Sequence, residues 1–395
     1  MSFTIALSGI NAINTELNTI SNNIANSSTY GFKSSRANFA SMYAGTQPTG
    51  TEVSSLTQSI EVGGGVLTTG RGLDASIQGR GFFVARDTSG AEVYTRVGIF
   101  STDKEGYVVD SFNRKVQGYA AVPGTDTLGA MGNLQVPTGQ ILAQASATLE
   151  YVGNLSADWT VPTVAPFDHT DYQSYNGSMV SVVYDSLGVQ HSVTQYFVKS
   201  GVNQVTAHYT FDGVDQATTT VLDFDTNGRL VAPAGAVPLA FGTPPGAAPL
   251  TVDMNYTGTT QSAGEATTST NRADGYASGT FLGVQLSADG SVLAQYSNGE
   301  KQSIGTIALA TFPAENSLVP ISDTSWTTSS ESGAALYFAP GSGMAGTLTP
   351  GALEQSNVDM TAQLVNLMSA QRNYQANTKV ISAENEMMQT LMQAV

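Results

Sequence analysis

The sequence predicts a mainly β protein with α-helical coiled-coil segments at both termini, in a nested multi-domain architecture. The terminal helices pair, an inner β domain lies between them, and an outer β domain is inserted into the inner one. Near both ends, apolar residues recur at intervals of three and four, which is the period of coiled-coil helices. The interior contains short alternating runs separated by Asn-Gly and Asp-Gly turns, which are typical of antiparallel strands.

The first helix is predicted within segment 1–30 from an apolar stripe that averages about 3.5 residues per turn and so stays on one face. The stripe consists of Phe3, Leu7, Ile10, Ile13, Leu17, Ile20 and Ile24.

Segment 358–395 repeats this pattern over a longer stretch that contains neither Gly nor Pro. Gln371, Thr378 and Asn385 recur every seven residues, and polar groups at such positions fix helix register at some cost in stability. Asp359 is a candidate N-cap. The whole stripe is Met360, Leu364, Leu367, Gln371, Tyr374, Thr378, Ile381, Asn385, Met388, Met392 and Val395, and its members up to Met388 are the predicted interface residues.

Because no other helix is predicted, each stripe can be covered only by the opposite terminus or by further copies of the chain. We therefore interpret both stripes as an assembly interface. An ordinary core helix would show the same spacing. The position of the two stripes at the ends of an all-β body instead favours association with other copies.

The rest of the chain divides into segments that differ in composition and sequence pattern. Segment 31–71 is rich in Gly, Ser and Thr and predicts an extended connector, with short strands around 59–62. Segments 72–148 and 284–357 predict the inner β domain, and 149–283 the inserted outer one. Within 231–270, low charge and five prolines predict a long surface loop. These are Pro233, Pro238, Pro244, Pro245 and Pro249.

Composition excludes several functions. The chain of 395 residues carries 15 Lys and Arg against 31 Asp and Glu, so no basic surface exists for a nucleic acid. It has no Cys, which excludes disulfides and thiolate metal sites. No apolar run is long enough for membrane insertion. Met1–Gly9 lacks the basic and apolar regions of a cleaved secretory signal, so an extracellular location requires another export route.

Candidate chemical motifs are weak. Gly341–Gly346 spells G-x-G-x-x-G, but the following Thr347–Pro350 cannot open a helix, so a plain turn is favoured over nucleotide binding. Asp223–Gly228 matches the start of a calcium loop, yet its twelfth position is Ala234, which favours a hairpin turn and leaves open only a weak cation site.

The three histidines, His169, His191 and His208, lack metal-ligand spacing. No G-x-S-x-G motif precedes a helix, so a hydrolase triad has no anchor, although a glycosidase-type carboxylate pair stays open. We predict no catalytic site, no metal and no cofactor.

Three blocks resemble the family of bacterial flagellar rod and hook proteins. The N-terminal signature is formed by Ser21, Asn22, Asn23, Ile24, Ala25, Asn26, Thr29, Gly31, Phe32 and Lys33. The ending Gln371, Arg372, Asn373, Tyr374 and Gln375 is similar to the family's C-terminus. Between them, Gly81–Val84, Tyr94–Phe100 and Gly106–Tyr119 resemble its conserved β segment. Ser27-Ser28 departs mildly from the usual pattern.

Within that family, the length and the inserted domain favour a hook subunit. The resemblance implies many copies stacked into a curved hollow tube that acts as a universal joint, transmitting torque from motor and rod to filament. The terminal helices would line its channel. Implied partners are other copies, the distal rod protein, the hook cap scaffold, the hook–filament junction protein and the flagellar type III export apparatus. The location would be outside the cell, without signal cleavage.

Two alternatives remain at this stage. The chain could be a distal rod or hook–filament junction subunit of the same axial structure. A different class, a secreted β-rich surface binding protein, gives the terminal heptads no evident use, and an enzyme on a β scaffold comes last.

Overall fold

The computed structural model describes residues 2–122 and 127–394. The chain divides into two compact units. The first consists of 1–138, 283–295 and 301–395, and the second of 139–282 and 296–300. The chain is mainly β with a helix near each terminus, which confirms the predicted fold class.

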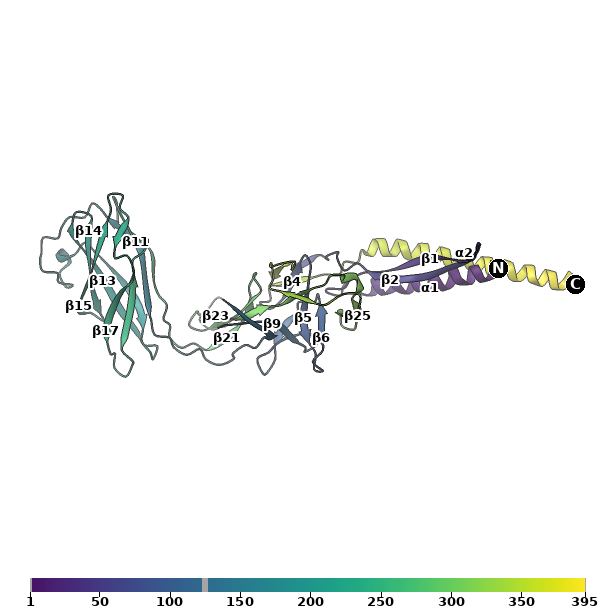
Figure 1. Ribbon diagram of the computed structural model, residues 1–395, viewed down its shortest axis with the longest axis horizontal. Coiled ribbons are helices and arrows are strands. Elements are labelled where there is room, and N and C mark those ends of the chain that lie inside the picture. Colours follow the sequence, from purple (N-terminus) through teal and green to yellow (C-terminus); the bar gives the residue numbers. More distant parts are fainter. Residues whose placement is uncertain (1, 123–126, 395) are drawn as a thin grey trace. The chain divides into compact units, whose positions relative to one another are not determined.

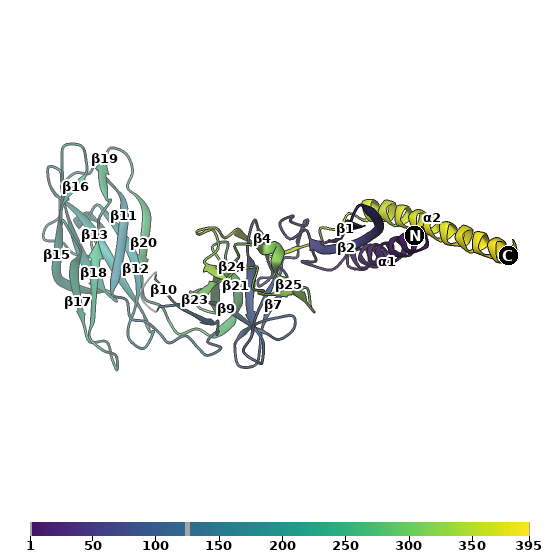
Figure 2. The same ribbon diagram turned by 45° about the vertical axis from the view of Figure 1, so that its right-hand side comes forward.

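Two antiparallel helices, α1 (Ser2–Ala25) and α2 (Met360–Ala394), lie side by side in the first unit (Figures 1 and 2). Both helix predictions are confirmed. Asp359 caps α2 as predicted, since its Oδ1 accepts the backbone N–H groups of Thr361 at 2.9 Å and Ala362 at 3.2 Å. Within the described residues, neither helix has the length and apolar character needed to cross a membrane.

A long antiparallel hairpin, β1 (Ser35–Ala44) and β2 (Gln47–Gln58), lies along α1 (Figure 1). The prediction of an extended connector over 31–71 is therefore wrong. Gly45, with φ of 62°, forms the two-residue turn. The strands are mostly exposed and Ser- and Thr-rich, so they show no clear apolar alternation, and the face toward α1 supplies their support.

A 13-stranded sheet forms the body of the first unit. In its core, Phe312 packs edge to face with Phe82 and Tyr94, and Trp326 is tilted against Phe82. Its main path is β21 (Phe281–Leu286), β22 (Ser291–Tyr296), β23 (Lys301–Ile307), β9 (Lys115–Ala121), β5 (Phe82–Arg86), β6 (Glu92–Thr95), β26 (Ser325–Thr327) and β25 (Val319–Ile321). Branching from it are β7 (Phe100–Thr102), β8 (Val108–Asp110), β10 (Leu128–Asn133), β24 (Leu309–Thr311) and β27 (Leu336–Phe338).

Two short strand pairs join the outgoing chain to the returning chain. They are β3 (Val66–Thr68) with β29 (Ala352–Glu354), and β4 (Ala75–Gln78) with β28 (Thr347–Pro350). They place the segment that follows the hairpin beside the segment that leads into α2.

The second unit is a sandwich of two five-stranded sheets around one apolar core (Figure 2). One sheet contains β11 (Thr148–Ser156), β17 (Val237–Gly242), β18 (Leu250–Asn255), β19 (Thr260–Ser262) and β20 (Thr267–Ala273). The other runs in order through β12 (Gly177–Tyr184), β13 (Gln190–Gly201), β14 (Gln204–Phe211), β15 (Val214–Phe224) and β16 (Leu230–Ala232).

Two of the predicted Asp-Gly and Asn-Gly turns are confirmed, whereas the predicted proline-rich loop is not. Asp212-Gly213 is a two-residue hairpin turn with both φ values positive, and Asn227-Gly228 turns β15 into β16. The prediction of a long loop over 231–270 is wrong, because β17 to β20 occupy it. Pro238 is tolerated there because β17 is an edge strand.

Candidate assembly interface

The two terminal helices share a small apolar cluster. Ile13 and Ile20 of α1 pack with Ala370 of α2, and three half-buried side chains surround them. These are Leu17, Ile24 and Leu367. The predicted stripes therefore meet each other within one chain, but only along part of their length.

Asn23 fixes the pairing at the end of α1. Its side chain is 1% exposed and donates to Gln363 Oε1 of α2 at 3.3 Å and to the Ser35 carbonyl of β1 at 2.8 Å. The Ser35 N–H donates back to Asn23 Oδ1 at 2.9 Å. One signature asparagine thus joins α1, α2 and the hairpin.

The face of α2 that is covered differs from the predicted stripe. Its buried and half-buried positions are Gln363, Leu367, Ala370, Asn377, Ile381 and Glu384. Leu367 and Ile381 agree with the prediction, whereas Gln371, Thr378 and Asn385 are exposed. For the pairing within one chain, the placement of these three polar residues in the seam is wrong. The covered residues Ala370, Asn377 and Glu384 each lie one position before a predicted one. Small residues of α1, such as Gly9 beside Asn377, allow the helices to approach each other on that face.

Many apolar members of the predicted stripes have no cover. Leu364 is 47% exposed and Met388 is 59% exposed, and α2 continues past the start of α1 at its C-terminal end (Figure 1). The other exposed members are Phe3, Leu7, Met360 and Tyr374. Exposed apolar side chains repeated along one pair of helices indicate an interaction site.

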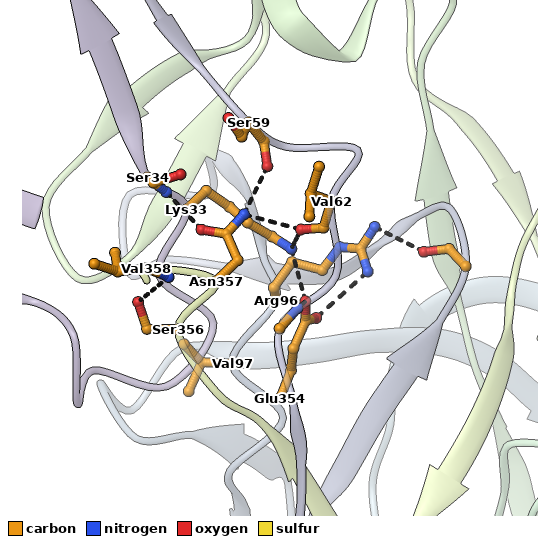
Figure 3. Close-up of polar contacts among 12 residues, drawn as sticks. Lys33, Ser34, Ser59, Val62, Arg96, Val97, Glu354, Ser356, Asn357 and Val358 are labelled. Atoms are coloured by element: carbon orange, nitrogen blue, oxygen red, sulfur yellow. Dashed lines mark hydrogen bonds and ion pairs between the residues drawn. The ribbon is translucent and has the colours of Figure 1, made fainter. Parts of the chain in front are cut away.

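Lys33, the last residue of the N-terminal signature, joins Arg96 and Glu354 in a buried ionic junction (Figure 3). Lys33 Nζ lies 2.6 Å from Glu354 Oε1, and Arg96 Nη1 lies 3.4 Å from Glu354 Oε2. All three side chains are at most 3% exposed. Arg96 also donates to the Gly79 carbonyl at 2.9 Å, and Lys33 to the Val62 carbonyl at 2.8 Å. One carboxylate thus ties three distant segments together.

Burial sets the electrostatics of this junction. It lowers the pKa of Lys33, and the attraction of Glu354 opposes that shift without cancelling it. It lowers the pKa of Arg96 for the same reason. Glu354 is therefore the main group that keeps two buried cations charged, with a further attraction from Glu315, and its removal would leave both cations without a hydrogen-bonded carboxylate.

Asn357 closes the junction beside the start of α2 (Figure 3). Its Oδ1 accepts the Ser34 N–H at 2.8 Å, and its Nδ2 donates to the carbonyls of Ser59 and Val62 at 2.9 and 3.0 Å. Gly31 has a φ of 67°, and an added Cβ would lie 3.0 Å from the Arg96 backbone, so this turn requires glycine.

Sequence reasoning missed the role of Glu354. Its signal was a lone acid directly after two apolar residues, in a strand whose three residues are all buried. Lys33 was singled out only as a signature residue, since its partner lies 321 positions away.

The remaining chemical candidates have structural partners. Gly341 and Gly346 close a turn that precedes β28, and Asp225 Oδ1 accepts the N–H groups of Asn227 and Arg229. His191 pairs with Asp185 and Asp212, and His169 with Asp215, while His208 stacks on Phe167. Across 2–122 and 127–394, no three His, Asp or Glu side chains gather as a metal site would require.

Comparison with known proteins gives matches over nearly the whole length. The chain is 39% identical to the flagellar hook protein FlgE of Escherichia coli, with 99% of each chain covered. The chain belongs to the flagellar hook protein FlgE family. It is also 38% identical to FlgE of Salmonella typhimurium over 99% of each chain, and 31% identical to FlgE of Treponema pallidum over 98% and 97%.

Four family models match successive parts of this FlgE-family chain. They are described as flagella basal body rod protein (3–33), flagellar hook protein FlgE/F/G D1 domain (76–157), flagellar basal body protein FlaE D2 domain (154–276) and flagellar basal body rod FlgEFG protein C-terminal (349–394). The fold resembles the crystal structure of Helicobacter pylori flagellar hook protein FlgE2, with a TM-score of 0.52 at 12% identity, covering 73% of this chain and 100% of that one.

Proposed function

We propose that the chain is the structural subunit of a bacterial flagellar hook, one of many copies stacked into a curved hollow tube that transmits torque from rod to filament. The observation that carries this proposal is the exposed apolar stripe on the paired terminal helices. One chain leaves it uncovered, and burying each such side chain contributes about 1.5–3 kcal/mol.

In this tube, segments 1–30 and 358–395 form the inner core around the channel. Segments 72–148 and 284–357 form the wall, and 149–283 faces outward. A bending tube needs strong axial contacts that tolerate small shifts. The exposed Met360, Met368, Met387, Met388 and Met392 suit this, because thioether side chains repack with little cost.

The partners of this subunit are first of all other copies of itself. At the ends of the tube we propose the distal rod protein and the hook–filament junction protein, with a hook cap scaffold during growth. Export proceeds through the flagellar type III apparatus without signal cleavage, and the subunit works outside the cell. We propose no catalytic activity, metal or cofactor for it.

The test uses a bacterium that lacks its hook-subunit gene but retains rods. Expression of this chain restores hooks that are visible by electron microscopy of purified hook–basal bodies. Leu364→Asp gives a subunit that is exported and folded but forms no tube, because a charge replaces an exposed apolar side chain that would be buried against a neighbouring copy. Leu142→Asp is the matched control in the second unit, where an 81% exposed leucine is replaced without loss of hooks.

Absence of hooks with the unaltered, exported chain contradicts the proposal. Restoration of a missing rod or junction instead of the hook assigns the chain to that other part of the axial structure.

A further inference from the structure

The face of α2 that points away from α1 carries an ordered series of charges. Val365, Arg372, Lys379 and Glu386 follow one another at intervals of seven, and all four are exposed. Seven residues are nearly two helical turns, so the four side chains form one stripe that drifts by about 20° per step. It lies opposite Leu367, Ala370 and Ile381, the side of α2 that is covered.

The charged members of this stripe have no ion-pair partner in the part of the chain that the structure describes. Lys379 and Glu386 are about 10.5 Å apart along the helix axis, and Arg372 and Glu386 about 21 Å, so neither pair can form within one helix. Along α2 the stripe therefore consists of one apolar residue, two positive residues and one negative residue, in that order. Its charges are free to pair with another molecule.

The order of charges selects an arrangement of two copies. In a tube built by repeating one subunit, neighbouring copies point the same way, so an α2–α2 contact is parallel. With no offset, every charge faces its like. An offset of one heptad pairs Glu386 with Lys379 but sets Lys379 against Arg372. An offset of two heptads sets Glu386 beside Arg372 and Lys379 beside Val365, and no like charges face each other.

We propose that α2 of one copy packs along α2 of the next in the same direction, offset by two heptads, with Glu386 of one beside Arg372 of the other. This register, which rests on the proposed hook assembly, corresponds to a shift of about 21 Å along the helix. The aliphatic stem of Lys379 then covers Val365 of the neighbour. Opposite charges at an interface of this kind set partner direction and register more than raw affinity.

The contact is of the head-to-tail kind. Each copy uses its C-terminal Glu386 toward one neighbour and its Arg372 toward another, so the contact does not close on itself and extends into an open helical array. The apolar side chains flanking the stripe at its first end, Leu364 and Met368, are exposed and add area to the same surface.

The experiment is a charge exchange in the full chain, read out by hooks per cell in the hook-deficient strain and by the critical concentration for polymerisation of the purified chain. Arg372→Glu and Glu386→Arg each place like charges at the contact and raise the critical concentration about tenfold. The double exchange R372E/E386R returns it to within about twofold of the unaltered chain. Because the two residues are about 21 Å apart in one helix, restoration acts between copies.

The matched control is K379E/E386R, which restores polymerisation only if the offset is one heptad. Circular dichroism and the amount of exported chain report on folding and export for every variant. Restoration by K379E/E386R and not by R372E/E386R overturns the two-heptad register. Normal polymerisation of both single variants overturns the contact itself. Neither result touches the hook assignment, which fails only if the unaltered chain forms no hooks.

Discussion

The β-sandwich of the second unit and the helical pair of the first differ in how completely one chain satisfies them. In the sandwich, Val193, Val252 and Met254 are fully buried among many apolar neighbours. Its interior hydroxyls also pair, since Tyr209 Oη contacts Tyr256 Oη at 2.9 Å and Tyr256 donates to Gln195 Oε1 at 2.8 Å. The helical pair has a core of six side chains, and more large apolar side chains than that are exposed on the two helices.

The comparison shows that apolar residues of the same types serve two different purposes in this chain. In the sandwich they stabilise the fold of one molecule, whereas on the helices much of their burial awaits a neighbour. Substitutions should therefore affect monomer stability in one region and association in the other.

The largest expected effect tests the sandwich core. Phe197→Ala removes a ring that is 2% exposed and tilts against Tyr151 at 5.2 Å, which lowers the free energy of unfolding by about 3–5 kcal/mol. Leu364→Ala on α2 changes it by about 0.5 kcal/mol or less. Urea denaturation of both purified variants measures this contrast. Equal losses would mean that Leu364 is covered within one chain.

The second effect tests the ionic junction in the first unit. Glu354→Gln leaves Lys33 and Arg96 buried without a hydrogen-bonded carboxylate and costs about 3 kcal/mol, because the other hydrogen bonds of both cations go to backbone carbonyls and only the more distant Glu315 still attracts them. Glu150→Gln removes the partner of Arg272 in an exposed pair and serves as the control, with a loss of at most about 1 kcal/mol. Similar denaturation midpoints for the two variants would argue against a buried junction.

A smaller effect concerns the start of α2. Asp359→Ala removes the oxygen that accepts two backbone N–H groups and costs about 1 kcal/mol. Asp359→Asn keeps an acceptor and should lose only a fraction of that. Amide hydrogen exchange in the first turn of α2 measures the change, and unchanged protection in Asp359→Ala would show that the cap is dispensable.

The smallest effect is a pH dependence confined to the sandwich. Burial disfavours the charged form of His191, but hydrogen bonds to Asp212 and Asp185 outweigh it and raise the pKa. Stabilisation from this group is complete below its unfolded value of about 6.5 and is lost as pH rises through the raised pKa. Burial alone would raise the pKa values of Asp185 and Asp212. Hydrogen bonds from His191 and from backbone N–H groups outweigh burial, so both pKa values are lowered. Their contribution is lost in acid, below about pH 4.

The contribution of His191 to the melting temperature of the sandwich should thus be complete near about pH 5 and fall by about 2–4 °C toward pH 8. Burial lowers the pKa of His208 in the same unit, so the contribution of His208 changes in the opposite direction, and the comparison with a His191 variant isolates the effect of His191. His191→Gln removes that decline without changing the fold. Calorimetry of the full chain across this range is the measurement, and an identical decline in His191→Gln would assign it to other groups.

Much of the outline could be predicted from the sequence because it depends on near neighbours. The spacing of Ile13, Leu17 and Ile20 requires a helix wherever the segment lies, and Asp212-Gly213 requires a tight turn between the strands on either side. Asp359 caps α2 through bonds to residues two and three positions away. The family signature is likewise a property of contiguous residues.

The tertiary structure decided what near neighbours do not determine. The hairpin β1–β2 exists because α1 supports strands with little apolar alternation of their own, and Pro238 is accommodated because β17 happens to be an edge. Which of two adjacent stripes on α2 meets α1 depended on small residues of α1, hundreds of positions away. Lys33, Arg96 and Glu354 form a junction only once three segments converge. Periodicity and turn chemistry act within a few residues, whereas burial and ion pairing depend on contacts between segments that are distant in the chain.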